Sequence, residues 1–484
     1  MKTSCLMASL LLALLAGCVS APVPPKGAVW MPPRDARQSD SGWQALRKRT
    51  PSFERPLALA DLADLALQGN PATATAWQAA RAAAERVTQA QGYFMPEFVA
   101  SASAGATRTM AEPSLYDADR VRYGAGISLD YLVINFGGGR RAAVEQALNT
   151  VYAADYACNR AIDDVLLGVA TSYYSLLSAR AGVEAAAANS RDARKTLDAA
   201  QEGLRQGLGT KLDVLQAQAN MDRAQYGMAT AESVAAVARG ALAMAVGIPA
   251  DTEFNVAAVT NATPPAAAVG DMRAFIDEAL NRRPDIAALR ASVRAAEAAV
   301  NVAAAAQWPS LYLTGALDES IYNLREGQPM QDRAMPYSAG LALRWTLFDG
   351  HRTVSARRIA EAEADGARAS LLSAELGAGA EAWTRYQNYA SAIAKLNAAE
   401  AYLGSASAAH NLALESYRAK LRSLVDLLTA ESQLAEARSQ AVAARQDAFI
   451  AFSELAHATG RLTRDGLVAT ERPLAAPGRK DNAP

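Results

Sequence analysis

Four windows of the chain alternate apolar and polar residues with a period of two, the pattern of a β-strand whose two faces meet different surroundings. These windows cover residues 97–108, 121–134, 310–318 and 337–347. In the last one, Tyr337, Leu341 and Trp345 share the apolar face, whereas Ser338 and Arg344 lie on the other. Such alternation over about ten residues is typical of membrane β-barrel strands, although a half-buried soluble sheet alternates in the same way.

Long stretches without proline separate the strand windows. They are rich in Ala, Leu, Glu, Arg and Gln, which favour helix. The predicted helices cover residues 58–93, 139–206, 210–246, 271–306, 351–419 and 423–459. A helix of nearly seventy residues extends about 100 Å, which is too long for a compact domain. Its small seam residues permit the close approach of coiled-coil packing.

Characteristic residues of the first half of the chain recur in the second half at a constant offset of 213 positions. Four pairs share this offset, namely Pro71 and Pro284, Pro96 and Pro309, Asp213 and Asp426, and Gly247 and Gly460. A fifth pair, Phe136 and Phe348, falls one position short of it. We therefore predict an internal duplication. The predicted segments are a signal peptide (1–17), a proline-rich arm (18–56), a first repeat (57–248), a linker (249–270), a second repeat (271–462) and a loose tail (463–484).

The N-terminus has the pattern of an export signal. Lys2 precedes an apolar stretch, Leu6 to Ala16, that is too short to cross a membrane and ends in Leu15-Ala16-Gly17-Cys18. Small residues before a cysteine resemble a bacterial lipobox. The resemblance implies cleavage before Cys18 and lipid on that cysteine, and Val19 in place of an aspartate favours the outer membrane. An ordinary signal peptide with a chance cysteine is the alternative.

Composition excludes several classes of function. Lys and Arg number 48 and Asp and Glu number 49, so the basic excess of a nucleic-acid binder is absent. Three cysteines cannot form a disulfide framework, and three scattered histidines have no metal-ligand spacing. Because the phosphate-loop and dinucleotide-loop motifs also fail, we expect no enzyme activity, cofactor or metal.

Membrane insertion would have to use the strands. Beyond the N-terminus we find no apolar run of about 18 residues, so no membrane-spanning helix is expected. Four strands cannot close a barrel, since the smallest single-chain membrane barrels have about eight. Open strand edges in lipid would leave unpaired backbone groups, so several chains would have to close one barrel together.

The order of motifs resembles the TolC-type outer-membrane efflux proteins, in particular their lipoprotein branch. The motifs are Asn70-Pro71, Arg283-Pro284-Asp285, Leu347-Phe348-Asp349-Gly350, Leu212-Asp213-Val214-Leu215 and Leu424-Val425-Asp426-Leu427-Leu428. The resemblance covers residues 57–462. It implies a mainly α fold with a β-barrel portion, in which a long α-helical barrel continues into a trimeric twelve-stranded transmembrane β-barrel with four strands per chain. It also implies a passive exit duct in the outer membrane that docks to a periplasmic adaptor and an inner-membrane transporter.

The same resemblance places a gate at the turns that end the two long helical hairpins, Gly207-Leu208-Gly209 (the first tip) and Lys420-Leu421-Arg422-Ser423 (the second tip). It implies that Asp426 forms a ring at the periplasmic aperture, and that Tyr417 and Arg422 contact the first tip of a neighbouring chain, with Asp213 as the partner of Tyr417. Leu212 and Thr429 depart from the family pattern, which points to a different closing contact. An acidic residue in the first turn of a helix is the alternative explanation for Asp213 and Asp426.

Two other functions stay open at this stage. One is a type I protein-secretion exit duct, which belongs to the same class of channel. The other is a lipid-anchored periplasmic coiled-coil scaffold that crosses no membrane. The scaffold would account for the helices and for Cys18, but it leaves the alternating strands without a purpose.

Overall fold

The computed structural model describes Phe53 and residues 55–109, 118–257, 272–324, 331–419 and 421–463. All of these belong to one compact unit, residues 52–484. The predicted signal peptide, Cys18 and the predicted C-terminal tail beyond residue 463 lie outside the described residues.

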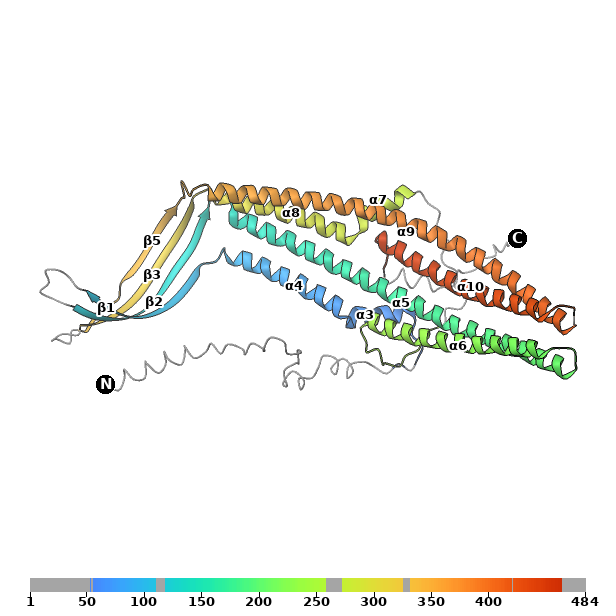
Figure 1. Cartoon of the computed structure of the whole chain (residues 1–484). Helices are drawn as coiled ribbons and strands as arrows, with labels where there is room; N and C mark the ends of the chain where they lie inside the picture. The colour runs from blue at the N-terminus through green and yellow to red at the C-terminus, as the bar shows by residue number, and fades with distance from the viewer. Residues whose placement is uncertain are drawn as a thin grey trace, which may run out of the picture. The chain divides into compact units, whose positions relative to one another are not determined.

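The two halves of the chain contain the same elements in the same order (Figure 1). The first half contains α3 (Leu59–Gly69), α4 (Pro71–Gly92), β1 (Glu97–Thr109), β2 (Ala118–Asn135), α5 (Gly139–Arg205) and α6 (Lys211–Val246). The second contains α7 (Met272–Arg282), α8 (Pro284–Ala305), β3 (Ser310–Leu324), β4 (Gln331–Ala334), β5 (Tyr337–Arg344), α9 (Arg352–Arg418) and α10 (Leu424–Ala458). The predicted ends of α5, α6, α9 and α10 agree with the structure to within one residue.

The first predicted helix of each half is wrong in one respect, because a proline divides it in two. The residue before each proline, Asn70 and Arg283, has an extended backbone with ψ of 127° and 125°. Steric conflict with the proline ring disfavours helical geometry at that position. Each proline then begins the next helix, where its missing N–H costs nothing. The sequence prediction used Pro71 and Pro284 as landmarks but continued the helices through them.

The sheet is entirely antiparallel, with β1, β2 and β3 in sequence order and β4 and β5 both on the far side of β3. β4 and β5 share one register on β3, since Ser320 pairs with Ala334 and Leu317 with Tyr337. Between them the Asp318 N–H donates to the Pro336 carbonyl at 3.0 Å. They are therefore two parts of one strand interrupted at Pro336, and each chain contributes four strands' width of sheet.

Strand register places the apolar windows on one face. Opposed residues of an antiparallel pair share a face. Apolar residues meet across all three ladders, as in Phe98 with Leu129, Ile127 with Leu317, and Leu313 with Leu341; Ser101 with Gly126 and Thr314 with Gly340 are opposed on the other face. The prediction that the alternating windows form a two-faced sheet is confirmed. On the apolar face, Tyr337 lies in the middle of the β4–β5 strand, whereas Trp345 directly follows β5.

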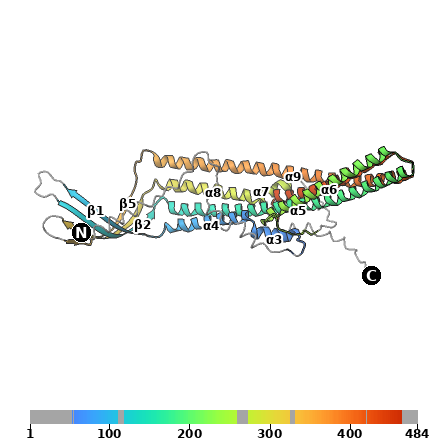
Figure 2. The ribbon, with the colours of Figure 1, turned by 60° about the horizontal axis from the view of Figure 1, so that its bottom comes forward.

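The helices form a single layer rather than a closed bundle. Next to the sheet they pack in the order α4, α5, α8 and α9, and toward the hairpin tips in the order α6, α5, α10 and α9 (Figures 1 and 2). Both layers, like the sheet, have two open edges within the described residues. Open edges in the sheet and in both helical layers are what a chain needs if it forms one part of the wall of a larger tube.

One apolar core lies where α3, α5, α6 and α10 meet. It is built around the fully buried Tyr173 and Leu62 and includes Leu242 and Phe449. The break between α3 and α4 helps to fix the position of α6, because the Asn70 side chain at this break donates to the Ala245 carbonyl of α6 at 2.9 Å. In the second half, Arg283 occupies the position that corresponds to Asn70. Its guanidinium also binds Asp285 at 2.8 Å and Glu381 at 2.5 Å.

Asp163 on α5 provides a pH-dependent contribution to stability. Burial, reinforced by the carboxylates of Asp164 and Asp285 and opposed by Arg160, raises its pKa to about 6. The folded state therefore binds this proton more tightly than the unfolded state, and the resulting stabilisation disappears as the pH rises through about 6. We expect Asp163→Asn to raise the melting temperature of the purified protein at pH 7.5 and to have little effect at pH 4.

The neighbouring Asp164→Asn is the matched control for this prediction. Asp164 binds Arg160 at 2.9 Å and His457 at 2.8 Å, so its replacement should lower the melting temperature at pH 7.5. Circular dichroism at several pH values measures both variants. A stabilisation by Asp163→Asn that is equally large at pH 4 would contradict the assignment.

α6 departs from the sequence expectation in one way. Within the described residues it is the one helix that is long and apolar enough to cross a membrane, judged by length and composition alone. Little of its apolar stretch is buried within one chain, and Val237 and Met244 are exposed. Because α6 lies at an open edge of the helical layer, these residues are available to pack against another chain.

Candidate functional site

The two hairpin tips share one backbone geometry despite different sequences. At the first tip the Leu208 N–H donates to the Gly203 carbonyl at 2.8 Å, and at the second the Leu421 N–H donates to the Ser416 carbonyl at 2.8 Å. These bonds occupy equivalent positions of the two repeats and close the C-terminal ends of α5 and α9. The duplication therefore extends to the turns themselves.

Asp213 and Asp426 occupy the same capping position in α6 and α10. The Asp213 carboxylate accepts from the Thr210 N–H at 2.8 Å, while the Thr210 hydroxyl accepts from the Asp213 N–H at 3.1 Å. Ser423 and Asp426 repeat this reciprocal arrangement, with 3.2 Å for each backbone bond. Such capping boxes satisfy the free N–H groups at a helix start, so the first-turn role weighed from the sequence is present at both positions.

Asp426 is held in its charged form. The Ser423 hydroxyl donates to its carboxylate at 2.9 Å, and this bond, with the Ser423 N–H and the charge of Arg422, keeps the pKa of Asp426 below its usual value. Arg422 itself is exposed. The structure thus brings Asp426 and Arg422 together at the second tip, in a position open to solvent.

Tyr417 lies beneath the second tip. Its side chain is 7% exposed and packs with Leu424 and Leu427. Burial raises the pKa of the Tyr417 hydroxyl, and the charge of Asp213 from the same chain raises it further. Tyr417 and Asp213 are therefore near each other within one chain, whereas the family resemblance implied a neighbouring chain's Asp213.

The two positions that depart from the family pattern have ordinary surroundings. Thr429 donates its hydroxyl to the Val425 carbonyl within α10 at 2.8 Å. Leu212 is 62% exposed. It belongs to a set of apolar side chains that the two tips present to solvent, namely Leu208, Leu212, Leu215, Leu421 and Val425. Clustered exposed apolar side chains at the end of an element indicate a binding surface for another protein.

The sequence prediction missed a polar contact between the two hairpins. Glu431 on α10 accepts from Thr196 on α5 and Asn220 on α6, both at 3.0 Å. Arg438 on α10 donates to Asn189 and Asp192 on α5. A signal existed, because Glu431 and Arg438 follow Leu427 and Leu434 at heptad spacing, where apolar residues are usual.

Among the residues that the structure describes, no group of three or more His, Cys, Asp or Glu side chains is placed to hold a metal ion. Cys158 on α5 is a half-buried free thiol.

Comparison with known proteins settles the family. A sequence model described as "Outer membrane efflux protein" matches residues 62–248 and 275–461, two ranges related by the same offset as the internal repeat. The chain belongs to the outer membrane efflux protein family. The predicted resemblance is therefore confirmed.

Two curated relatives agree with this family assignment. The chain is 30% identical to Protein CyaE of Bordetella pertussis over 382 residues, 78% of each chain. It is also 30% identical over 253 residues to the pyoverdine export outer membrane protein OpmQ of Pseudomonas aeruginosa, covering 49% of this chain and 52% of that one.

Solved structures show the same fold. The outer-membrane channel OprN aligns with a TM-score of 0.72 at 23% identity, over 83% of this chain and 89% of that one. CusC aligns with a TM-score of 0.73 at 18% identity, over 91% and 99%.

The predicted fold class and function are confirmed with the family. The chain is an outer-membrane efflux channel, and its relatives and structural neighbours are channels rather than enzymes. Channels of this family form trimers, with a twelve-stranded barrel to which each chain contributes. The open edges of the sheet and of the helical layer are the surfaces that such a trimer closes.

Proposed function

We propose that the hairpin tips dock to a periplasmic adaptor, which connects this channel to an inner-membrane transporter in a tripartite efflux system. The single observation that carries this proposal is the set of exposed apolar side chains at the tips, where Leu421 is 79% exposed and Leu212 is 62% exposed. An apolar tip can bury its surface against a partner without disturbing the rest of the channel.

The aperture of the duct lies at the same tips in this proposal. Three copies of Asp426, one from each chain, face a common axis and form a small anionic ring that favours cations. Arg422, Tyr417 and Asp213 hold the second tip in its resting position. Capping alone would also explain Asp213 and Asp426, so the ring rests on the family resemblance and on the solvent-exposed position of Asp426.

The anchor of the channel is lipid on Cys18, supported by the Leu15-Ala16-Gly17-Cys18 sequence at the end of an apolar stretch. Mass spectrometry of the mature protein tests this assignment directly. An acylated Cys18 as the first residue supports it, and any other first residue contradicts it.

Replacement of the apolar tip residues tests the docking proposal. We expect the double variant Leu212→Asp and Leu421→Asp to lose dye efflux by at least tenfold in living cells, because two charges per chain would enter an apolar interface. Trimer levels in the outer membrane should be unchanged, since neither side chain packs inside the chain.

The matched control is Lys211→Ala, which changes the charge of the first tip and leaves its apolar surface intact. It should retain efflux. Full efflux by the double aspartate variant would contradict docking at the tips. Lost trimers together with lost efflux would assign Leu212 and Leu421 to the channel's own assembly.

A further inference from the structure

The contact between the two hairpins changes character along α5 and α10. At the end nearer α3 it is apolar, since Tyr174 of α5 stacks on Phe449 of α10 with ring centroids 4.8 Å apart and planes 12° apart. Both rings belong to the buried core that joins α3, α5, α6 and α10. Separation of the hairpins at this point would expose a large apolar area to water, which is strongly unfavourable.

Toward the tips the contact becomes polar. Glu431 accepts from the Thr196 hydroxyl and the Asn220 amide, and Arg438 donates to Asn189 at 2.6 Å and to Asp192 at 3.0 Å. The apolar clusters there lie within single hairpins. In the described residues, Ala199 is the one α5 side chain that joins an apolar cluster of α9 and α10.

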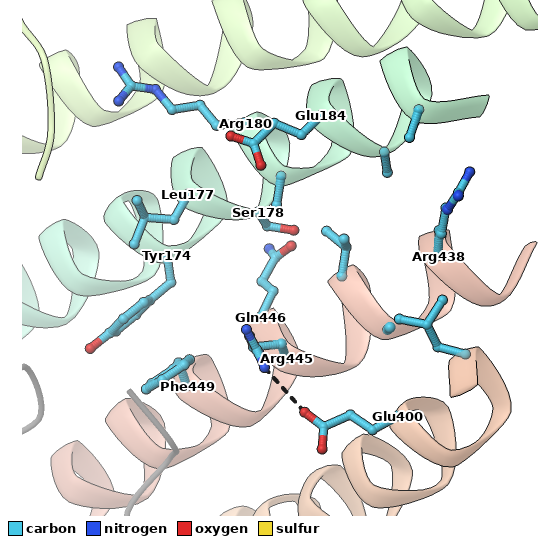
Figure 3. A pocket seen from close by; sticks show the side chains of 16 residues that line it. Tyr174, Leu177, Ser178, Arg180, Glu184, Glu400, Arg438, Arg445, Gln446 and Phe449 are labelled. Carbon is cyan, nitrogen blue, oxygen red and sulfur yellow. Dashed lines mark hydrogen bonds and ion pairs between the residues drawn. The ribbon is translucent and has the colours of Figure 1, made fainter. Parts of the chain in front are cut away.

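Two hollows flank this polar stretch. One, of about 670 Å³, begins at Tyr174 and Phe449 and ends at Arg438, and Figure 3 shows these side chains at its opposite ends. The other, of about 590 Å³, lies between α6 and α10 and is lined by Asn189, Asn220 and Glu431. Because a cavity lies on each side of this contact, little apolar packing joins the hairpins here, and polar side chains make many of the contacts between them.

The electrostatics suit a contact that can open. Glu431 is 6% exposed, and burial raises its pKa although Thr196 and Asn220 donate to it. The charged groups that face it are Asp192 on α5, which repels it, and Arg438 on α10, which attracts it. Charge-assisted hydrogen bonds of this kind favour the closed arrangement, and water can take over the freed donors and acceptors when the hairpins separate.

The arrangement is not a consequence of the duplication. The residues that correspond to Glu431 and Arg438 in the first repeat are Gln218 and Gln225, which are uncharged. Gln218 instead donates to Asp222 of its own helix at 2.8 Å. The charged contact is therefore specific to α10 and to the hairpin that carries Asp426.

We propose that Glu431 and Arg438 form a latch that holds the α9–α10 hairpin against α5 and α6, and that the tip aperture widens only when this latch separates about the Tyr174–Phe449 stack. Glu431 and Arg438 are thus positioning residues for the gate. The proposal rests on the proposed function, in which the tips form the aperture. Thr196, the partner of Glu431, lies about 14 Å along α5 from the end of that helix at Arg205, and the partners of Arg438, Asn189 and Asp192, lie further from the tip.

Single-channel recording in planar bilayers tests the latch. We expect Glu431→Ala and Arg438→Ala each to raise the mean conductance of purified trimers several-fold, because loss of charge-assisted bonds shifts a two-state equilibrium by about tenfold or more. Glu431→Gln, which keeps one acceptor oxygen, should lie between Glu431→Ala and the unaltered channel.

Matched controls come from the same helix. Among the described residues, Glu436 accepts a hydrogen bond from Gln440 within α10, and Arg445 binds Glu400 on α9 at 3.2 Å, inside the same hairpin. Glu436→Ala and Arg445→Ala should therefore leave the conductance unchanged. Equal effects from these controls would overturn the latch, because they would show that any lost charge on α10 opens the channel.

A cross-link distinguishes gating from general stability. We expect Thr196→Cys with Glu431→Cys, in a Cys158→Ser background, to hold low conductance when the two thiols are joined by a short bis-methanethiosulfonate linker, and to exceed the unaltered channel when that linker is cleaved by reduction. This result would also decide the matter if Glu431→Ala failed to form trimers. Unchanged conductance of both the linked and the cleaved form overturns the latch.

Asp426→Ala separates failure of the latch from failure of the aperture. Altered cation selectivity in Asp426→Ala, with unchanged conductance in the latch variants, would leave the aperture in place and overturn the latch. Unchanged selectivity in Asp426→Ala would remove the aperture from the tips, and with it the basis of the latch.

Discussion

Leu341→Arg should sharply reduce the amount of trimer in the outer membrane. Leu341 is 70% exposed in β5 and lies opposite Leu313 on the apolar face of the sheet. We expect this face to meet lipid in the trimeric barrel, where an arginine near the bilayer midplane costs roughly 2–4 kcal/mol. Quantitative blotting of heat-modifiable trimers in outer-membrane fractions measures the effect.

Ser338→Arg is the control for this prediction. Ser338 lies in the same strand opposite Ala316, on the other face of the sheet, which we expect to line the lumen of the barrel. An arginine there stays in water, so trimer levels should remain close to those of the unaltered protein. Equal tolerance of the two substitutions would mean that the sheet has no lipid face.

Gly137→Ala should abolish or nearly abolish trimer formation. Gly137 lies in the turn between β2 and α5, and a Cβ atom there would lie 2.6 Å from the Ala305 Cα and 2.7 Å from the Ala305 carbonyl oxygen. Rotation of a side chain cannot relieve this conflict because both atoms are backbone. The end of α8 would have to move away from the turn, at an expected cost of about 3 kcal/mol.

The adjacent Gly138→Asn provides a sharp contrast. Gly138 has a φ of +72°, which normally favours glycine, but a Cβ there would meet nothing within 4 Å. Its counterpart in the second repeat, His351, adopts a φ of 68° with a full side chain. Asparagine tolerates this geometry, so Gly138→Asn should form trimers, as native gel migration would show. Normal trimers from Gly137→Ala would contradict the close approach of the turn and α8.

Much of the fold could be predicted because its signals are long and repeated. The long helices were bounded to within a residue, since glycine or a capping Ser, Thr or Asp marks most of their ends. The breaks at Pro71 and Pro284 were missed because Ala-rich sequence continues on both sides of them. The β4 segment was missed because Pro336 interrupts the alternation, although the register on β3 continues across it.

The site was less accessible to sequence reasoning. The local role of Asp213 and Asp426 could be foreseen, because a capping acid acts within one helical turn of its partner. The proximity of Asp213 and Tyr417 within one chain depends on how the two hairpins pack, which no local pattern encodes. Glu431 and Arg438 could have been found as charged residues on an apolar seam, but their partners on α5 and α6 belong to the other repeat.

We expect several copies of this chain together to form an ion-permeable duct through the outer membrane. Single-channel recording of purified trimers in planar lipid bilayers tests it most directly. We expect discrete channels whose conductance rises in the Glu431→Ala variant. A protein that extracts as a monomer from the periplasmic face and produces no channels would contradict it, and would favour a lipid-anchored periplasmic scaffold.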